Sequence, residues 1–207
     1  MNNKILEYLD KLYPNPKCEL NYNKDYELLI ATLLSAQTTD KRVNEVTSVL
    51  FKKYPSIKDL SVVPINNLEE IIRPIGTYKR KSIYVHEITN KLVLDNLDYI
   101  PNDREYIEGL PGVGHKTANV FLSNIYDEAA IAVDTHVARL SKRLGIAKEN
   151  DDVGVIEKKL MRVIPRERWS RTHHQLVLFG RYNCRAINPL CENCKIKEFC
   201  KYKKGKN

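Results

Sequence analysis

Four cysteines in the last quarter of the chain have the spacing of a metal site. Cys184, Cys191, Cys194 and Cys200 form the pattern C-x6-C-x2-C-x5-C. Four thiolates within 17 residues are a strong signal for a bound metal. Tetrahedral zinc and a 4Fe–4S cluster both accept four cysteines. The residue types therefore predict a metal centre and leave the choice of metal open.

A second chemical feature is a glycine-rich turn that leads into a helix carrying a lysine. From residue 110 the chain reads Leu-Pro-Gly-Val-Gly-His-Lys-Thr-Ala. Glycines permit a positive φ and a close backbone approach, and a helix N-terminus offers unpaired N–H groups to a phosphate. The string is not a dinucleotide fingerprint, since position 117 is threonine where that motif has glycine. It is not a Walker loop either, because the spacing from glycine to lysine is wrong and no predicted strand precedes it. A DNA phosphate site and an ordinary helix–turn–helix connection both fit it.

Lys116 and Asp134 are the candidate reactive side chains. A deprotonated lysine amine can attack a sugar C1′ and form an imine, and a helix N-terminus disfavours the charged ammonium. Taken alone, Lys116 also suits a solvated lysine or a phosphate contact. Asp134 lies 18 residues further on, at a predicted helix start, where aspartate commonly acts as an N-cap.

The elements that must position these residues are predicted to be helices. Apolar residues recur at helical spacing almost throughout, and no segment alternates as a strand, which predicts an all-α fold. The longest predicted helix covers 79–95, with Ile83 among its inward residues, and the last before the cysteines covers 172–182. Expected caps are Asp25, Thr39 or Asp40, Asp103, Asp134, and Asp151 or Asp152.

Composition favours a DNA partner. The 207-residue chain has a formal charge of +8 and a pI of about 9.1, and lysines crowd its C-terminus. A basic balance favours a polyanion such as nucleic acid. No apolar run approaches the ~20 residues that span a bilayer, and the first residues lack a signal-peptide core. We therefore expect no membrane association and an intracellular location, in the cytoplasm or nucleoid.

The hairpin string resembles the helix-hairpin-helix motif of the endonuclease III family of DNA glycosylases. Three further strings agree with it in order: Leu-Ser-Ala-Gln-Thr-Thr-Asp at 34–40, Ala-Val-Asp-Thr-His-Val at 132–137, and the four-cysteine spacing. The resemblance implies two helical lobes with a DNA cleft between them. A six-helix barrel lobe with the hairpin is expected at 20–128, and an iron–sulfur cluster lobe at 1–19 plus 129–207.

The same resemblance implies a reaction. Lys116 would be the nucleophile, and Asp134 the carboxylate that helps to activate it and stabilises developing positive charge. The enzyme would remove oxidised pyrimidines of the thymine glycol type from duplex DNA, then break the strand by β-elimination as an abasic-site lyase. The partner would be double-stranded DNA containing damaged bases or abasic sites, bound by a monomer.

The resemblance also assigns binding residues. The four cysteines would hold a 4Fe–4S cluster, for which we expect a structural role. Independently of the resemblance, Arg185 in the cysteine loop and the basic tail after it suit a second phosphate-binding surface. Gln37 would fill the gap left by the flipped nucleotide. At the usual position of a wedge leucine the chain has Thr77, which departs from many relatives. The hairpin residues expected to contact DNA are Leu110, Gly112, Val113, Gly114 and His115.

Three alternatives remain at this point. A monofunctional mismatch glycosylase is disfavoured because such relatives generally lack the lysine at position 116. A non-catalytic DNA-binding module is disfavoured because both Lys116 and Asp134 are present. A zinc-stabilised interaction protein would be colourless when purified, whereas an iron–sulfur protein is brown.

Overall fold

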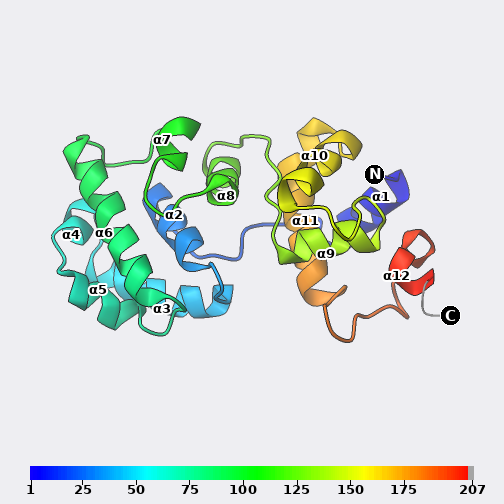
Figure 1. The fold of residues 1–207 in the computed structure, drawn as a ribbon, viewed down its shortest axis with the longest axis horizontal. Coiled ribbons are helices and arrows are strands. Elements are labelled where there is room, and N and C mark those ends of the chain that lie inside the picture. The colour runs from blue at the N-terminus through cyan, green and yellow to red at the C-terminus, as the bar shows by residue number, and fades with distance from the viewer. Residues whose placement is uncertain (205–207) are drawn as a thin grey trace. The chain divides into compact units, whose positions relative to one another are not determined.

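The computed structural model describes residues 1–204, and its regular secondary structure in that range consists of helices joined by loops, with no strand (Figure 1). This confirms the all-α prediction. None of the helices in this range is long and apolar enough to cross a membrane. The α-helices are α1 (Asn3–Leu12), α2 (Asp25–Leu34), α3 (Asp40–Lys53), α4 (Ile57–Ser61), α5 (Ile65–Ile72), α6 (Tyr78–Leu94), α7 (Arg104–Glu108), α8 (His115–Ile125), α9 (Thr135–Arg143), α10 (Val153–Val163), α11 (Trp169–Tyr182) and α12 (Lys201–Lys204).

The chain divides into two compact units. Unit 2 is the continuous segment Cys18–Tyr126, and unit 1 combines Met1–Lys17 with the chain from Asp127 onward. Each unit has its own cluster of buried apolar side chains. The amino-acid composition shows no boundary between the units, because both are built from the same kinds of helices.

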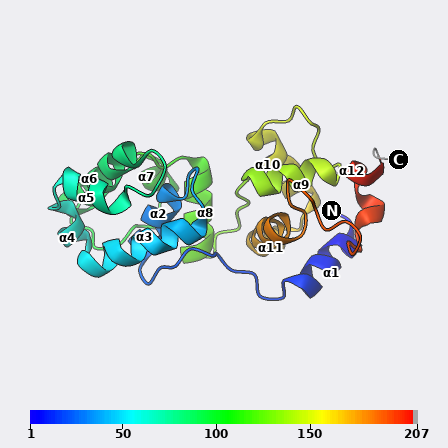
Figure 2. The same ribbon diagram turned by 90° about the horizontal axis from the view of Figure 1, so that it is seen from below.

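Unit 2 is built around α2, which lies among the other helices of the unit (Figure 2). Every residue from 26 to 34 is buried, and α2 packs against α3, α6 and α8. A helix that is apolar on all sides needs neighbours on all sides. Helices α3, α6 and α8 therefore cover α2.

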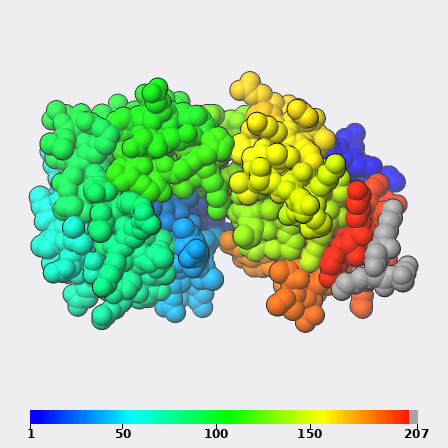
Figure 3. Space-filling model, in the orientation of Figure 1, coloured from blue at the N-terminus to red at the C-terminus, as the bar shows by residue number. Residues whose placement is uncertain are grey.

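Unit 1 joins the two ends of the sequence. Helix α1 packs on α11, and α9 packs on both α10 and α11. Asp10 of α1 accepts hydrogen bonds from Arg168, Arg171 and Gln175. The N-terminal helix and the C-terminal segment lie side by side on the surface, where Lys4 and Glu198 approach within 3.9 Å (Figure 3).

Local capping predictions are mostly confirmed, with one error. Thr39, Asp103, Asp134 and Asp152 each accept a backbone N–H in the first turn of their helix. The Asp25 cap is wrong: Glu27 takes the N–H of Asn23 at 2.7 Å, while Asp25 Oδ2 accepts the N–H of Ile100 at 2.6 Å. Asp25 is the first residue of α2 and not its N-cap: Oδ1 accepts the N–H of Tyr26 at 2.7 Å, and Oδ2 is bonded to a residue 75 positions away.

Three boundary or burial expectations also differ. Ile83 was expected inward, yet it is 41% exposed on α6. Helix α11 begins at Trp169, three residues before the expected start, because the short 3-10 turn Arg166–Arg168 leads directly into it. The last helix, α12, was not predicted, since its lysine-rich sequence has no apolar period.

Candidate active site and metal centre

The hairpin of unit 2 connects α7 to α8. The side chains of Leu110 and Val113 are buried, at 2% and 6% exposure, and join the core of the unit. Gly112, Gly114 and His115 are exposed. The five hairpin residues that were expected to contact DNA thus fall into two groups. Two have side chains buried in the core of the unit, and three are exposed at its surface.

The two hairpin glycines have different surroundings. Gly112 has φ +74°, and a Cβ there would lie 2.4 Å from Cδ2 of the Tyr84 ring. Gly114 has φ −105° and ψ 176°, a conformation open to any residue, and a Cβ there would meet nothing within 4 Å. The fold therefore requires glycine at 112 and leaves the space above 114 open.

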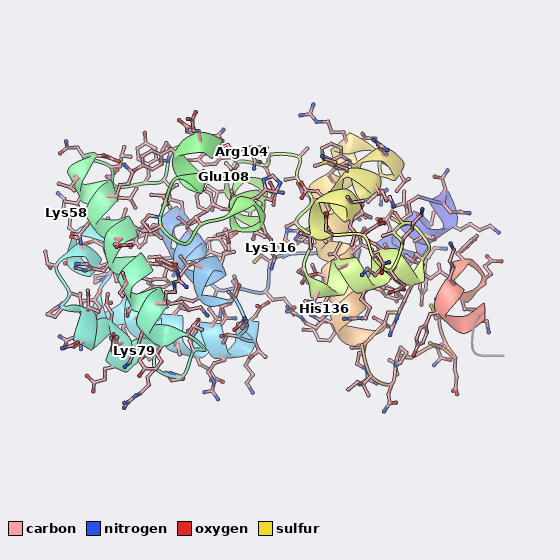
Figure 4. The ribbon with its side chains drawn as sticks, viewed as in Figure 1. Lys58, Lys79, Arg104, Glu108, Lys116 and His136 are labelled. Atoms are coloured by element: carbon pink, nitrogen blue, oxygen red, sulfur yellow. The ribbon has the colours of Figure 1, made fainter. Side chains whose placement is uncertain are left out.

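A charged network holds the residues at the start of α8. Glu108 Oε1 accepts Arg104 Nη1 at 3.0 Å and lies 3.1 Å from His115 Nδ1. Figure 4 shows Arg104 and Glu108 on α7. Burial acts to raise the pKa of Glu108, but the hydrogen bonds from Arg104 and His115 outweigh it and hold that pKa below its ordinary value. Glu108 stays ionised and orients two basic side chains beside the helix N-terminus.

Lys116 occupies the second position of α8 and is exposed (Figure 4). The N-cap of this helix is Gly114, which has no side chain to accept the first N–H groups. Those N–H groups carry the partial positive charge of the helix end. An accessible amine therefore stands next to a surface suited to an anion.

Asp134 is the N-cap of α9 in unit 1 and is half-buried. Its Oδ1 accepts the N–H of Val137 at 2.8 Å. The cap uses one carboxylate oxygen, and Oδ2 takes no hydrogen bond from any described residue. The side chain is thus oriented by its own helix and keeps an oxygen for a second role.

Gln37 and Thr77 are neighbours at the surface of unit 2. Both are exposed and both adopt the left-handed region, with φ 58° and 57°. A Cβ on Gly76 would lie 3.6 Å from the Gln37 carbonyl oxygen, so the two loops are in contact. A positive φ is uncommon outside glycine, and a genuine outlier for β-branched threonine. Sequence patterns gave no indication that these residues would meet.

The four cysteines follow α11 and are all half-buried. Cys184, Cys191 and Cys194 line one cavity of about 180 Å³, together with Tyr8, Phe179, Asn183, Pro189, Leu190 and Asn193. Burial raises the pKa of the Cys184 and Cys194 thiols. Among residues 1–204, no three His, Cys, Asp or Glu side chains are grouped so as to hold a metal ion.

Two arginines of α9 hold this cysteine loop, and the sequence gave no assignment to them. Arg143 Nη1 donates to Cys184 Sγ at 3.1 Å and to the Arg185 carbonyl at 2.8 Å. Arg139 donates to the carbonyls of Cys184 and Gly180. Their spacing of four residues on the helix that Asp134 caps was the available signal. Arg185 itself is exposed, and its Nη2 donates to the Asn188 carbonyl.

Comparisons with known proteins agree with these features. Residues 30–166 match the family model of the HhH-GPD superfamily base excision DNA repair protein. Endonuclease III of Bacillus subtilis (strain 168) is 44% identical over 205 residues, covering 97% of this chain and 94% of that protein. Endonuclease III of Escherichia coli (strain K12) is 38% identical over 200 residues, with 97% and 94% coverage.

A solved structure of similar fold is described as a trapped endonuclease III–DNA covalent intermediate in an estranged-adenine complex. It has a TM-score of 0.93 and 43% sequence identity, and the match covers 99% of this chain and 98% of that chain. The chain belongs to the HhH-GPD superfamily of base excision DNA repair proteins and, within it, to the endonuclease III family.

Proposed function

We propose that Lys116 is the nucleophile with which this bifunctional DNA glycosylase and abasic-site lyase acts on damaged pyrimidines of the thymine glycol type in duplex DNA. The observation that carries the proposal is the placement of Lys116: it is exposed on the first turn of α8, two residues after Gly114, above which the space is open. Family membership supports the reaction class, because a related endonuclease III has been trapped as a covalent DNA intermediate.

The proposed reaction runs through an imine. With the damaged base extruded from the stack, Lys116 Nζ attacks C1′, the glycosidic bond breaks, and its electron pair leaves with the base. Proton loss and opening of the sugar ring give the imine. Removal of a C2′ proton then expels the 3′ phosphate, and water hydrolyses the imine to release the lysine.

Asp134 is proposed as the carboxylate partner of Lys116. Its Oδ2 is available to accept a proton from the attacking amine or to stabilise positive charge on the sugar, while Oδ1 caps α9. Lys116 belongs to unit 2 and Asp134 to unit 1. The proposal therefore makes both units necessary for catalysis.

DNA contacts are proposed for the exposed part of the hairpin and for two further side chains. The N–H groups after Gly114, with His115 held by Glu108, suit a backbone phosphate. Arg185 suits a second phosphate, and Gln37 the gap left by the extruded nucleotide. A DNA substrate also implies that the protein works where DNA is found, in the cytoplasm or nucleoid.

We further propose that the four cysteines hold a 4Fe–4S cluster. The cavity of about 180 Å³ beside Cys184, Cys191 and Cys194 suits a group larger than one ion, because zinc draws its sulfur ligands to ~2.3 Å. The Arg143 hydrogen bond to Cys184 Sγ suits a thiolate ligand. Such a cluster would supply a covalent cross-link for the loop, and no reaction step depends on it.

Borohydride trapping on a duplex with one thymine glycol tests the function. The native protein should form a covalent adduct, and Lys116→Ala should form none. Lys79→Ala, which removes an exposed lysine on α6, is the matched control and should trap normally. Base loss without an adduct would indicate a water-using monofunctional glycosylase and would overturn the assignment of Lys116.

A further inference from the structure

One face of α6 contacts both surface segments that the proposed function assigns to DNA. Lys81 and Tyr84 lie about one turn apart on this helix, after Thr77 at its N-cap. Lys81 Nζ donates to the carbonyls of Leu34 and Ala36, at 2.9 and 2.6 Å. The Tyr84 ring lies against Gly112 of the hairpin. A single helix thus joins the Gln37 loop to the hairpin.

The Lys81 side chain is unusual for a lysine near a protein surface. It is only 4% exposed, and within residues 1–204 it takes part in no ion pair. Burial of a cation without a counter-charge is costly, and burial lowers the pKa of Lys81. The carbonyls at the end of α2 offset part of this cost, because a helix C-terminus carries partial negative charge.

The bonds of Lys81 end next to Gln37. Ala36 is the residue before it, and Leu34 is the last residue of α2. Gln37 stands exposed at φ 58°, and Thr77 beside it at φ 57°. Strained backbone of this kind persists only where the surroundings over-determine it. Lys81 is one such constraint, because its hydrogen bond holds the carbonyl of the residue that precedes Gln37.

We propose that Lys81 is a positioning residue for base extrusion. Its ammonium holds the end of α2 so that Gln37 is presented beside Thr77 in the conformation that reaches the vacated position in the duplex. This inference rests on the gap-filling role proposed for Gln37. It predicts that the loss of Lys81 impairs extrusion from duplex DNA and spares the chemistry of Lys116.

The test compares Lys81→Met with the native protein on two substrates. One is a thymine glycol duplex, where extrusion leaves a gap in the base stack. The other is single-stranded DNA with an abasic site, where no stack must be opened. We expect single-turnover excision from the duplex to fall by at least about 10-fold, since small misplacements are costly, and single-strand cleavage to stay within about 2-fold.

Two further variants complete the design. Lys79→Met removes an exposed lysine from the same helix and should leave the ratio of the two rates unchanged. If Lys81→Met fails to fold, Lys81→Arg keeps the charge and N–H donors with altered geometry. It should show a smaller loss with the same preference for the duplex substrate.

A double-mutant cycle tests whether Lys81 acts through Gln37. If Lys81 acts through Gln37, adding Gln37→Ala to Lys81→Met should cause little further loss on the duplex. Equal losses on both substrates would make Lys81 a structural residue and overturn the inference. Loss with Gln37→Ala alone and none with Lys81→Met would overturn it too. An unaffected Gln37→Ala would instead overturn the proposed gap-filling role.

Discussion

The ring of Tyr84 occupies the space that a side chain at Gly112 would need. A Cβ on Gly112 would lie 2.4 Å from Tyr84 Cδ2, and the residue has φ +74°. Arg80 lies over the same ring, with its guanidinium carbon 5.7 Å from the ring centroid. Helix α6 therefore clamps the hairpin at Gly112, while Gly114 two residues later has open space around it. One glycine serves the fold, and the other leaves room for a ligand.

Alanine substitutions should separate these two roles. Gly112→Ala should lower the free energy of unfolding by about 2 kcal/mol or more, because left-handed strain adds to a clash with Tyr84. Gly114→Ala should change it by less than about 0.5 kcal/mol and weaken binding to duplex DNA. Thermal unfolding and fluorescence-anisotropy titration measure both. Equal unfolding effects of the two variants would contradict this assignment.

Substitutions of Asp134 should separate its role as a helix cap from its proposed role as a catalytic carboxylate. Asparagine caps helices as well as aspartate does, so Asp134→Asn should leave stability within about 0.5 kcal/mol of native. Its single-turnover excision rate should nevertheless fall by at least about 100-fold, since the charge is lost. Asp134→Ala should lose the same activity and a further ~1 kcal/mol of stability. An active Asp134→Asn would limit the residue to capping.

Thr77 should limit wedge insertion into the base stack. Thr77→Leu introduces a larger apolar side chain and should raise single-turnover excision by about 3-fold or more, because apolar wedges unstack base steps. The variant loses the hydrogen bond from Thr77 Oγ1 to the Gly76 carbonyl, so stability should fall by no more than about 1 kcal/mol. 2-Aminopurine fluorescence next to the lesion reports the distortion. An unchanged signal and rate would show that residue 77 does not insert.

Arg143 should support the cysteine loop. Arg143→Lys keeps the charge but cannot reproduce the fork that contacts Cys184 Sγ and the neighbouring carbonyls. Iron and sulfide per purified chain should fall by about half or more, because outer contacts to metal ligands carry much of the affinity. Lys142→Met is the control, since Lys142 bonds the Glu149 carbonyl instead. Equal iron content in both variants would argue against this support.

Asp10 should make unit 1 sensitive to acid. Burial acts to raise the pKa of Asp10, but hydrogen bonds from Gln175, Arg168 and Arg171 outweigh it and lower the pKa. Its stabilisation is therefore present above the unfolded pKa of about 3.9 and is lost as pH falls through the lower folded value.

Asp10→Asn should lower the unfolding midpoint at pH 7 by about 5 °C, given its loss of charge-assisted bonds. The difference between variant and native protein should shrink below pH 4, the acid side of the unfolded value. Thermal unfolding from pH 7 to pH 2.5 measures this trend. A difference that stays constant across the range would show that the charge of Asp10 does not stabilise the fold.

The sequence by itself determined the features that depend on near neighbours. Helical periodicity gave the all-α class. The caps Thr39, Asp103, Asp134 and Asp152 were predictable because a capping side chain and the backbone N–H that donates to it lie within three residues. The ordered motifs identified the family, which the comparisons confirm. The assignment of Lys116 and of the cysteines as site residues remains a prediction from those motifs.

Only the tertiary structure decided the contacts between distant segments. Asp25 bonds Ile100 instead of capping its helix, Lys81 is buried 45 residues from Ala36, and Arg143 reaches Cys184 across 41 residues. A lysine or arginine in a helical pattern is expected to be solvated, and its period does not reveal a buried carbonyl elsewhere in the chain. The backbone angles of Gln37 and Thr77 were likewise invisible, because strain is imposed by surrounding packing and not by residue type.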